Sequence, residues 1–308
     1  MNAFTRSVTQ AFTGAIKAFS TFPVSIGSAL CFAVVTIIRI QLEWPQQEPY
    51  NFLFNCLHWS FALGAIFSLA IITAAQSRYN TKNAFLLANA IGVIAVVATF
   101  VSLYYFGGQE PAIAGARYDY VSVIAVARVI AVMLISILSF IVLASYPAEK
   151  SDFARSLFMT HKAFFISLFY GMVIMGGASG VAGAFQALLY NDMSEKVYMY
   201  IATLTGFIVY TMFVGYFPDF RKGEEDPKRE IAQKQPRFIE ILFVYILIPI
   251  ILAMTAVLLA WAIKTILAGM GESSFIRLSS IATTYAIVGL WLHIMVTGND
   301  FGLAKFYR

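Results

Sequence analysis

Charged residues are scarce in this chain. Only 12% of its 308 residues are charged, 60% are apolar, and the mean hydropathy is +0.76. An ordinary soluble domain has about a quarter of its residues charged and about half apolar, so this composition excludes a water-soluble globular fold. In lipid every backbone amide must be paired within the protein, which leaves helices or a closed barrel. The apolar runs are long and continuous, unlike short alternating strands, and therefore favour helices.

Carboxylates are missing from the middle of every apolar run. Proton- and sodium-coupled carriers commonly use intramembrane carboxylates, so a coupled pump is disfavoured. The histidines, His58, His161 and His293, fall at different depths and predict no metal cluster, and no cofactor is expected. Cys31 and Cys56 lie inside apolar runs, where each is expected to pack as a small apolar side chain. No HExxH, GxSxG, CxxC or Walker-type sequence occurs, which disfavours an enzyme.

Long apolar stretches make up most of the sequence. Each is long enough to cross a hydrocarbon core of ~30 Å at a helical rise of ~1.5 Å per residue. We therefore predict an all-α, polytopic integral membrane helix bundle of about eight transmembrane helices. The predicted spans are 22–40, 52–76, 84–106, 120–145, 163–190, 197–217, 238–263 and 275–297.

Basic residues in the connections between spans predict the orientation. Fifteen Lys and Arg residues fall on one side and five on the other, with Arg128 inside a span. Since the basic side of a membrane protein is normally cytoplasmic, both termini are predicted to be cytoplasmic. A nucleic-acid surface is the weaker interpretation, because the basic residues are spread over five separate segments. No nucleic-acid partner is expected.

The chain shows a weak internal repeat. An amphipathic approach followed by an aromatic-bounded helix occurs at 12–34 and again at 153–175. This recurrence suggests two parallel four-span halves, which some carriers use and which duplication of any membrane scaffold also leaves. The connection 218–237 mixes both charge signs without an apolar face, so we predict a solvated linker and not a docking site. The predicted segments are an interfacial amphipathic segment at 1–21, a first half at 22–145, an interfacial connection at 146–162 and a second half at 163–308.

Arg128 is the clearest candidate for a functional side chain. It lies eight residues into the fourth predicted span, about 12 Å deep at ~1.5 Å per residue, where a guanidinium costs from ~3 to above ~10 kcal/mol. One interpretation is structural, with Arg128 bending toward outer headgroups or binding helix carbonyls. The other is an anion site for a phosphate headgroup or a carboxylate. On depth alone, the neighbours predicted for this candidate anion site are Asn55, His58, Gln186 and Ser179.

Glycine and proline mark two further positions in the spans. Small residues four apart let helix backbones approach closely, and many glycines also weaken a helix and expose its carbonyls. Pro249 predicts a kink in the seventh span that frees the carbonyl of Tyr245. The glycines with this predicted packing or helix-breaking role are Gly176, Gly177, Gly180 and Gly183.

The last third of the chain carries a family resemblance. A helix centred on Pro249 ends in the pattern Trp261-x-x-Lys264 and is followed by YAIVGLWLHIMVTGNDFGLAKFYR. With the Phe22-Pro23 entry to the first span, these features resemble the bacterial membrane family catalogued as domain of unknown function 4153, most strongly over 236–308. The resemblance implies a multi-pass protein of the bacterial cytoplasmic (inner) membrane. It implies no defined activity and transfers no functional residue.

Two classes of function fit these observations. The first is non-enzymatic binding or translocation of an anionic lipid or amphiphile near Arg128, with membrane lipids as partners. The second is a sensor or scaffold that packs on other membrane proteins and signals through its cytoplasmic loop. A pocket that reaches Arg128 would favour the first, and an exposed seam of small residues would favour the second. An enzyme with a lipid substrate ranks third.

Overall fold

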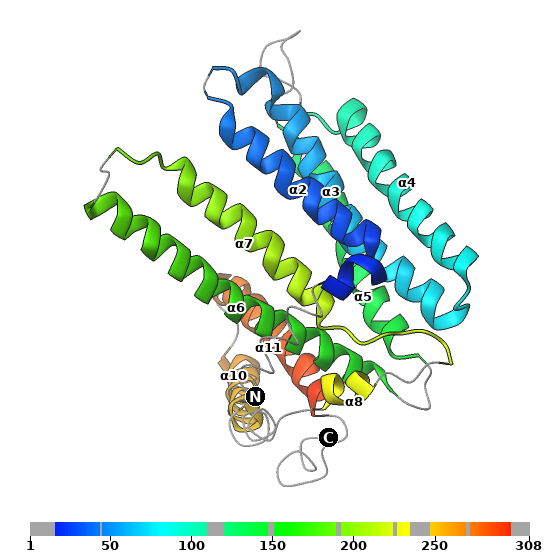
Figure 1. Cartoon of the computed structure of the whole chain (residues 1–308). Coiled ribbons are helices and arrows are strands. Elements are labelled where there is room, and N and C mark those ends of the chain that lie inside the picture. The colour runs from blue at the N-terminus through cyan, green and yellow to red at the C-terminus, as the bar shows by residue number, and fades with distance from the viewer. Residues whose placement is uncertain are drawn as a thin grey trace. The chain divides into compact units, whose positions relative to one another are not determined.

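The computed structural model confirms an all-α fold in the part of the chain that it describes, which is residues 16–43, 45–109, 120–146, 151–188, 192–223, 227–234, 247–268 and 272–296. Figure 1 shows the helices in chain order. They are α2 (Pro23–Gln41), the 3-10 turn η1 (Glu48–Tyr50), α3 (Asn51–Arg78), α4 (Lys82–Phe106), α5 (Val123–Ala144), α6 (Phe153–Leu188), α7 (Lys196–Gly215), α8 (Pro227–Gln233), α10 (Ile248–Ala268) and α11 (Glu272–Met295).

Seven of the described helices are long and apolar enough to cross a membrane, namely α2 to α7 and α10. The eighth predicted span corresponds to α11, whose described apolar part, Ser279–Met295, is shorter. Each predicted span therefore coincides with one helix, and the predicted polytopic membrane bundle is confirmed. The first part of the seventh predicted span lies outside the described residues.

The chain forms two compact units, Met1–Ala232 and Gln233–Arg308. The first contains α2 to α7 and most of α8, and the second contains α10 and α11. This boundary differs from the one at 146–162 between the two predicted halves. The parallel repeat and the interfacial role of 1–21 stay predictions.

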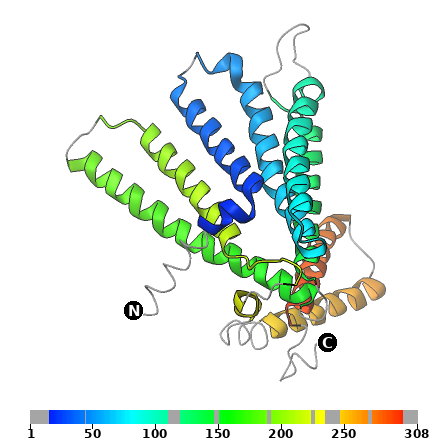
Figure 2. The ribbon, with the colours of Figure 1, turned by 45° about the vertical axis from the view of Figure 1, so that its right-hand side comes forward.

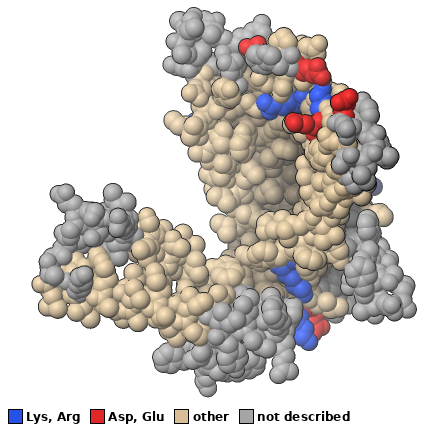
Figure 3. Space-filling model, turned by 90° about the vertical axis from the view of Figure 1, so that its left-hand side faces the viewer, with Lys and Arg blue, Asp and Glu red and all other residues tan. Residues whose placement is uncertain are grey.

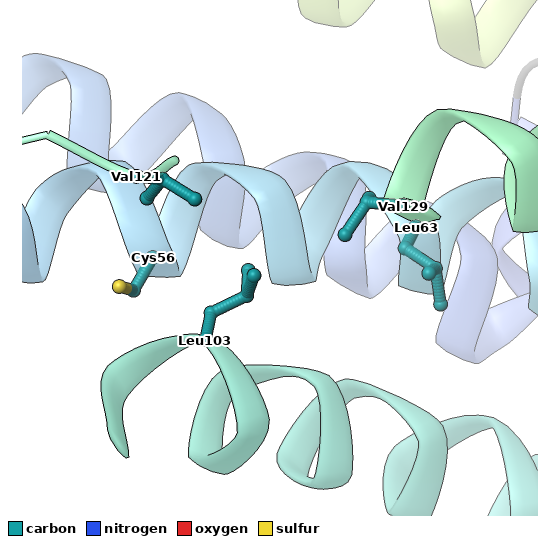
Figure 4. Close-up of a cluster of buried hydrophobic side chains, with 5 residues drawn as sticks. All are labelled: Cys56, Leu63, Leu103, Val121 and Val129. Atoms are coloured by element: carbon teal, nitrogen blue, oxygen red, sulfur yellow. The ribbon is translucent and has the colours of Figure 1, made fainter. Parts of the chain in front are cut away.

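Helix α3 is the centre of the first unit, where it packs against α2, α4 and α5. It is the most buried of the candidate spans. Buried side chains from α3, α4 and α5 meet in the apolar cluster of Figure 4, which consists of Cys56, Leu63, Leu103, Val121 and Val129. The expected apolar packing is confirmed for Cys56, whereas Cys31 is exposed on α2.

Close helix crossings in this unit use glycines other than the predicted ones. A Cβ at Gly64 of α3 would meet Val96 of α4 and Ser28 of α2. On α6, a Cβ at Gly171 would meet Val209 of α7. These contacts let neighbouring backbones approach closely, which is the usual role of small residues in membrane helices.

Polar side chains join three helices deep inside the first unit. The Ser25 hydroxyl of α2 donates to the Ala65 carbonyl of α3 at 2.8 Å. The Tyr210 hydroxyl of α7 donates to the same carbonyl at 2.9 Å and lies 2.7 Å from Ser25 Oγ. Such bonds stabilise helix association in lipid, where no water competes for the polar groups.

Helix α6 begins ten residues before the fifth predicted span. The stretch 153–162, predicted as part of a separate interfacial connection, is its first part. Asp152 Oδ1 accepts from the Arg155 backbone N–H at 2.7 Å and so caps the helix start. Met159 and Ala163 are fully buried there. The helix therefore begins earlier than the predicted span, and the interfacial location of 146–162 stays a prediction.

The connection after α7 is folded against the bundle, not a solvated linker as predicted. Phe220 is only 2% exposed and its ring lies 5.9 Å from that of Phe140 on α5. The Lys222 backbone N–H donates to the Gln76 carbonyl near the end of α3 at 3.0 Å. Arg229 of α8 donates to the carbonyl of Ala144, the last residue of α5. These contacts tie the described part of the connection to two helix ends.

The same contacts show that the helices of the first unit alternate in direction. The C-terminal ends of α3, α5 and α7 lie at one end of the unit, joined by the connection just described. At the other end, Lys196 at the start of α7 binds Glu43 just after α2. A multi-pass arrangement of α2 to α7 requires this alternation.

Candidate anion groove between α2 and α7

Arg39, in the last turn of α2, binds two amide side chains of α3. Its Nη1 donates to Asn55 Oδ1 at 3.0 Å, and its Nη2 donates to Asn51 Oδ1 at 3.3 Å. The two asparagines are one helical turn apart, so both oxygens face the forked guanidinium. Among the described residues no carboxylate lies within ion-pair distance of Arg39. Its positive charge is therefore held in place without being neutralised.

His58 lies one turn further along α3 and also faces α2. Its Nε2 is 3.0 Å from Thr36 Oγ1. Because the Thr36 hydroxyl already donates to the Phe32 carbonyl at 2.8 Å, the imidazole Nε2–H is the donor in this bond. The Phe32 ring lies 4.7 Å from the imidazole. His58 is thus a hydrogen-bonded packing residue beside the site.

A cavity of about 570 Å³ opens beside Arg39. It lies between the C-terminal end of α2 and the N-terminal end of α7, which are in contact. Its apolar wall includes Ile40, Leu42 and Met199, and its polar wall includes Arg39, Lys196 and the carboxylate residue Glu195. We call this cavity the α2–α7 groove. Figure 3 shows charged side chains gathered at this end of the described helices, with uncharged surface beneath them.

Lys196 supplies the second cation of the groove. Its Nζ donates to Glu43 Oε1 at 2.9 Å and to the Gln41 carbonyl at 3.3 Å. The bond from Lys196 lowers the pKa of the Glu43 carboxyl below its usual value. Glu43 is therefore ionised at neutral pH, and the ion pair is lost as the pH falls through that lowered pKa. Below it, Lys196 is free to bind another anion.

This arrangement suits a monoanionic or dianionic headgroup. Arg39 presents a fixed fork of N–H donors, which matches the oxygens of a phosphate or carboxylate. Lys196 lies at the same rim, where its Nζ is bound to Glu43 and to the Gln41 carbonyl. The apolar wall accommodates the hydrocarbon next to such a headgroup. No group of His, Cys, Asp and Glu residues among those described could hold a metal ion.

The structure separates the residues of the predicted Arg128 site. Asn55 and His58 face α2, where Arg39 and Thr36 are their partners. Gln186 Oε1 accepts from the Tyr198 hydroxyl at 2.9 Å, between α6 and α7. The Ser179 hydroxyl on α6 is buried and has no hydrogen-bond partner. No contact within the described chain joins any of them to Arg128.

Arg128 is exposed on α5, beside exposed Ile124 and Val132. It makes no hydrogen bond or ion pair with any described residue. It lies five residues after the helix start at Val123, about 8 Å along the axis at ~1.5 Å per residue. From there a long side chain reaches the headgroup layer. The predicted neighbours are therefore not brought to Arg128, and its role as an anion site or as a structural residue stays a prediction.

Replacing Arg128 with leucine should raise the thermal stability of the protein in detergent. The substitution removes a charge from an apolar surface. On membrane-insertion scales the free-energy gain of removing such a charge is at most ~3 kcal/mol. Differential scanning fluorimetry and quantification of copurified anionic lipid provide the measurement. A loss of that lipid in Arg128→Leu would restore the original site hypothesis.

The predicted packing role of the glycines has no partner helix within the described chain at three of the four positions. A Cβ at Gly176, Gly177 or Gly180 would meet nothing within 4 Å, and only Gly183 lies near a neighbour, Tyr198. Helix α6 also runs unbroken past all four positions, because its backbone bonds continue despite the weak propensity.

Pro249 is the second residue of α10 as the structure describes it, and residues 235–246 before it lie outside the described residues. The predicted kink and the released carbonyl of Tyr245 lie outside the described residues.

Sequence reasoning missed Arg39 and Lys196 because both were used only as markers of topology. A signal was present, since Asn51 and Asn55 stand one turn apart at the start of a span. Just before them, across a short connection, the preceding span ends with Arg39. A tight helical hairpin brings these positions together. Two asparagines one turn apart, opposite an arginine, therefore predict hydrogen bonds from the guanidinium to both amide oxygens.

Within the part of the chain that carries the family resemblance, 236–308, no described residue lines the α2–α7 groove. The groove is built entirely from residues between Thr36 and Met199. Family membership stays a prediction. Comparison with protein-family models, with curated proteins and with solved structures gives no match to this chain.

Proposed function

We propose that this chain is a non-enzymatic protein of the bacterial inner membrane that binds or translocates an anionic lipid or amphiphile. The headgroup binds in the α2–α7 groove, and the hydrocarbon lies along the apolar surfaces of the two helices. Both termini are cytoplasmic in this proposal, which places the groove at the outer membrane surface. The excess of Lys and Arg at the opposite ends of the spans supports this orientation.

One observation carries the proposal. Arg39 is held by two neutral amides, and no described carboxylate lies within ion-pair distance of it, at the wall of a cavity of about 570 Å³. A guanidinium without a binding role would be expected to form an ion pair with a carboxylate or to point into water, because both stabilise its charge. Neutral partners instead orient the side chain and leave its charge available to a ligand.

Replacing Arg39 with glutamine should weaken binding of an anionic amphiphile about tenfold or more. The variant loses a charge-assisted bond of ~1.5–3 kcal/mol, while the amide can still hydrogen-bond to Asn55. Short-chain phosphatidylglycerol, titrated into delipidated protein and followed by native mass spectrometry, is the measurement.

Arg128→Gln is the matched control, since it removes an exposed guanidinium that lines no described cavity. We expect wild-type affinity in this control. Equal weakening by both substitutions would show a general surface-charge effect and overturn the groove as the site.

The scaffold function has one observation in its favour. Gly176, Gly177 and Gly180 form an exposed seam of small residues on α6 that no described residue covers. Such seams pack against helices of partner membrane proteins. Unchanged lipid binding in Arg39→Gln would favour this second function over the first.

A further inference from the structure

An ion pair joins the two helix ends that form the α2–α7 groove. Lys196, the first residue of α7, donates from Nζ to Glu43 Oε1 at 2.9 Å, and Glu43 lies just after the end of α2. Figure 2 shows these two helix ends at the same end of the first unit. Among the described ion pairs, this is the only one that includes a residue lining the groove. One of the two groove cations is therefore already bound to a carboxylate of the chain itself.

The two partners of this ion pair are placed differently. Lys196 lines the groove and its side chain is 30% exposed, whereas the Glu43 side chain is 75% exposed and does not line the groove. Lys196 Nζ is the only hydrogen-bond donor to the Glu43 carboxylate among the described residues. Lys196 has a second partner, the Gln41 carbonyl at 3.3 Å. Glu43 can therefore turn into water while Lys196 keeps its place at the groove wall.

Glu43 binds only one of the two cations of the groove. Arg39, the other cation, is held by the amides of Asn51 and Asn55 and has no ion pair with Glu43. A phosphate in the groove can bond to both cations, because Arg39 and Lys196 line the same cavity. A single exposed ion pair is weak because water and salt screen it, whereas a charge-assisted bond to a fixed guanidinium is among the stronger polar interactions. A headgroup that binds both cations therefore displaces Glu43 from Lys196.

The packing of α2 against α7 does not depend on this ion pair. Deeper in the unit the same two helices are in contact, and the hydroxyls of Ser25 on α2 and Tyr210 on α7 lie 2.7 Å apart. These contacts stay when the exposed pair breaks. The bond between Glu43 and Lys196 can therefore open and close again without separating the helices.

We infer that Glu43 is an internal competitor of the anionic headgroup, one that binds Lys196 until the headgroup enters the groove and displaces it. This inference rests on the proposed function of the groove. The competition lowers the affinity for the headgroup below that of a groove with two unpaired cations. When the headgroup leaves, Glu43 binds Lys196 again, which favours release. A protein that passes a lipid on requires such a release step.

A double-mutant cycle on the full-length protein tests the competition, with short-chain phosphatidylglycerol as the probe and native mass spectrometry as the measurement. Glu43→Gln should strengthen binding about two- to fivefold, the range that an exposed ion pair contributes. Lys196→Gln should weaken binding, with Arg39 still present to bind the phosphate. In the Lys196→Gln background, Glu43→Gln should have no further effect, because the cation for which it competes has been removed.

Glu195→Gln is the matched control. Glu195 also lines the groove, but it forms no ion pair with a described residue. Its removal changes only the general repulsion between the groove and an anion. The effect of Glu195→Gln should therefore be the same with and without Lys196→Gln.

The competition would be overturned by an unchanged affinity in Glu43→Gln, or by a gain that persists in the Lys196→Gln background. If Lys196→Gln binds too weakly to titrate, Glu48→Gln replaces the cycle, because Glu48 is exposed and has no ion pair among the described residues. Equal gains in Glu43→Gln and Glu48→Gln would then overturn the competition. Wild-type affinity in Arg39→Gln would overturn the groove itself. Weaker binding in Arg39→Gln without a gain in Glu43→Gln would remove the competitor and keep the groove.

Discussion

Replacing Gly64 with leucine should strongly destabilise the bundle. Gly64 is buried on α3, and even a Cβ there would lie 2.9 Å from Ser28 Oγ of α2 and against Val96 of α4. Valine has one strongly preferred rotamer in a helix, so Val96 cannot turn away. A leucine side chain would push α2 and α4 away from the central helix. Overpacking of this kind costs ~1–3 kcal/mol, occasionally more.

Thermal unfolding of purified protein in detergent, followed by size-exclusion chromatography, measures the effect of Gly64→Leu. Gly177→Leu on α6 is the matched control, because nothing lies within 4 Å of a Cβ there. Exchange of a glycine for a good helix former gains up to ~1 kcal/mol in a helix interior, so the control should be as stable as wild type or more so. Gly64→Ala should fall between. Equal losses in the two leucine variants would contradict the proposed crossing.

The membrane helices could be predicted from hydropathy because lipid imposes one requirement on every span. A backbone without water must form its own hydrogen bonds over the whole apolar thickness. This rule fixes where helices lie along the chain and roughly how long they are. It does not fix their ends, and α6 shows why. Asp152 caps a helix in which residues 156–160 are already buried, whereas a hydropathy threshold treats this stretch as a polar approach.

The candidate site could be predicted only in part, because depth carries no information about rotation around the helix axis. The sequence predicted Asn55 and His58 as polar residues near the outer end of a span. Both face α2, the helix that carries Arg39. The cation is Arg39 and not Arg128. Residues at one depth on two helices meet only if both turn toward the shared interface, and Arg128 turns outward. Packing, which hydropathy does not encode, decides this.

The connection after α7 shows a second limit. Its composition resembles a solvated linker, yet it is held by a backbone N–H, one buried phenylalanine and one arginine. Main-chain bonds leave no trace in the sequence. A single aromatic residue among many charges is also a weak signal. Such contacts can be identified only in the three-dimensional structure, where the positions of the C-terminal ends of α3 and α5 are known.

Arg229 should be the residue on which that connection depends most. Its Nη2 donates to the carbonyl of Ala144 at 2.7 Å and to that of Tyr146 at 2.6 Å. These carbonyls belong to the C-terminal end of α5, where the last four lack partners within the helix and the helix dipole favours a cation. Burial lowers the pKa of Arg229, but the group stays charged at any physiological pH. Arg229→Met should lower stability by ~1–3 kcal/mol, the cost of leaving a buried acceptor unpaired.

Thermal unfolding in detergent and chymotrypsin cleavage after Phe220 test this prediction together. Phe220 is protected in the folded protein by its burial, and the Arg229 guanidinium lies 6.0 Å from its ring. Loss of Arg229 should therefore expose the Phe220 bond to cleavage as well as lower the unfolding temperature. Lys222→Met is the control, since only its backbone bonds to Gln76 and Asn80. If Arg229→Met were as stable and as protected as this control, the main-chain bonds alone would hold the connection, and the arginine would have no structural role there.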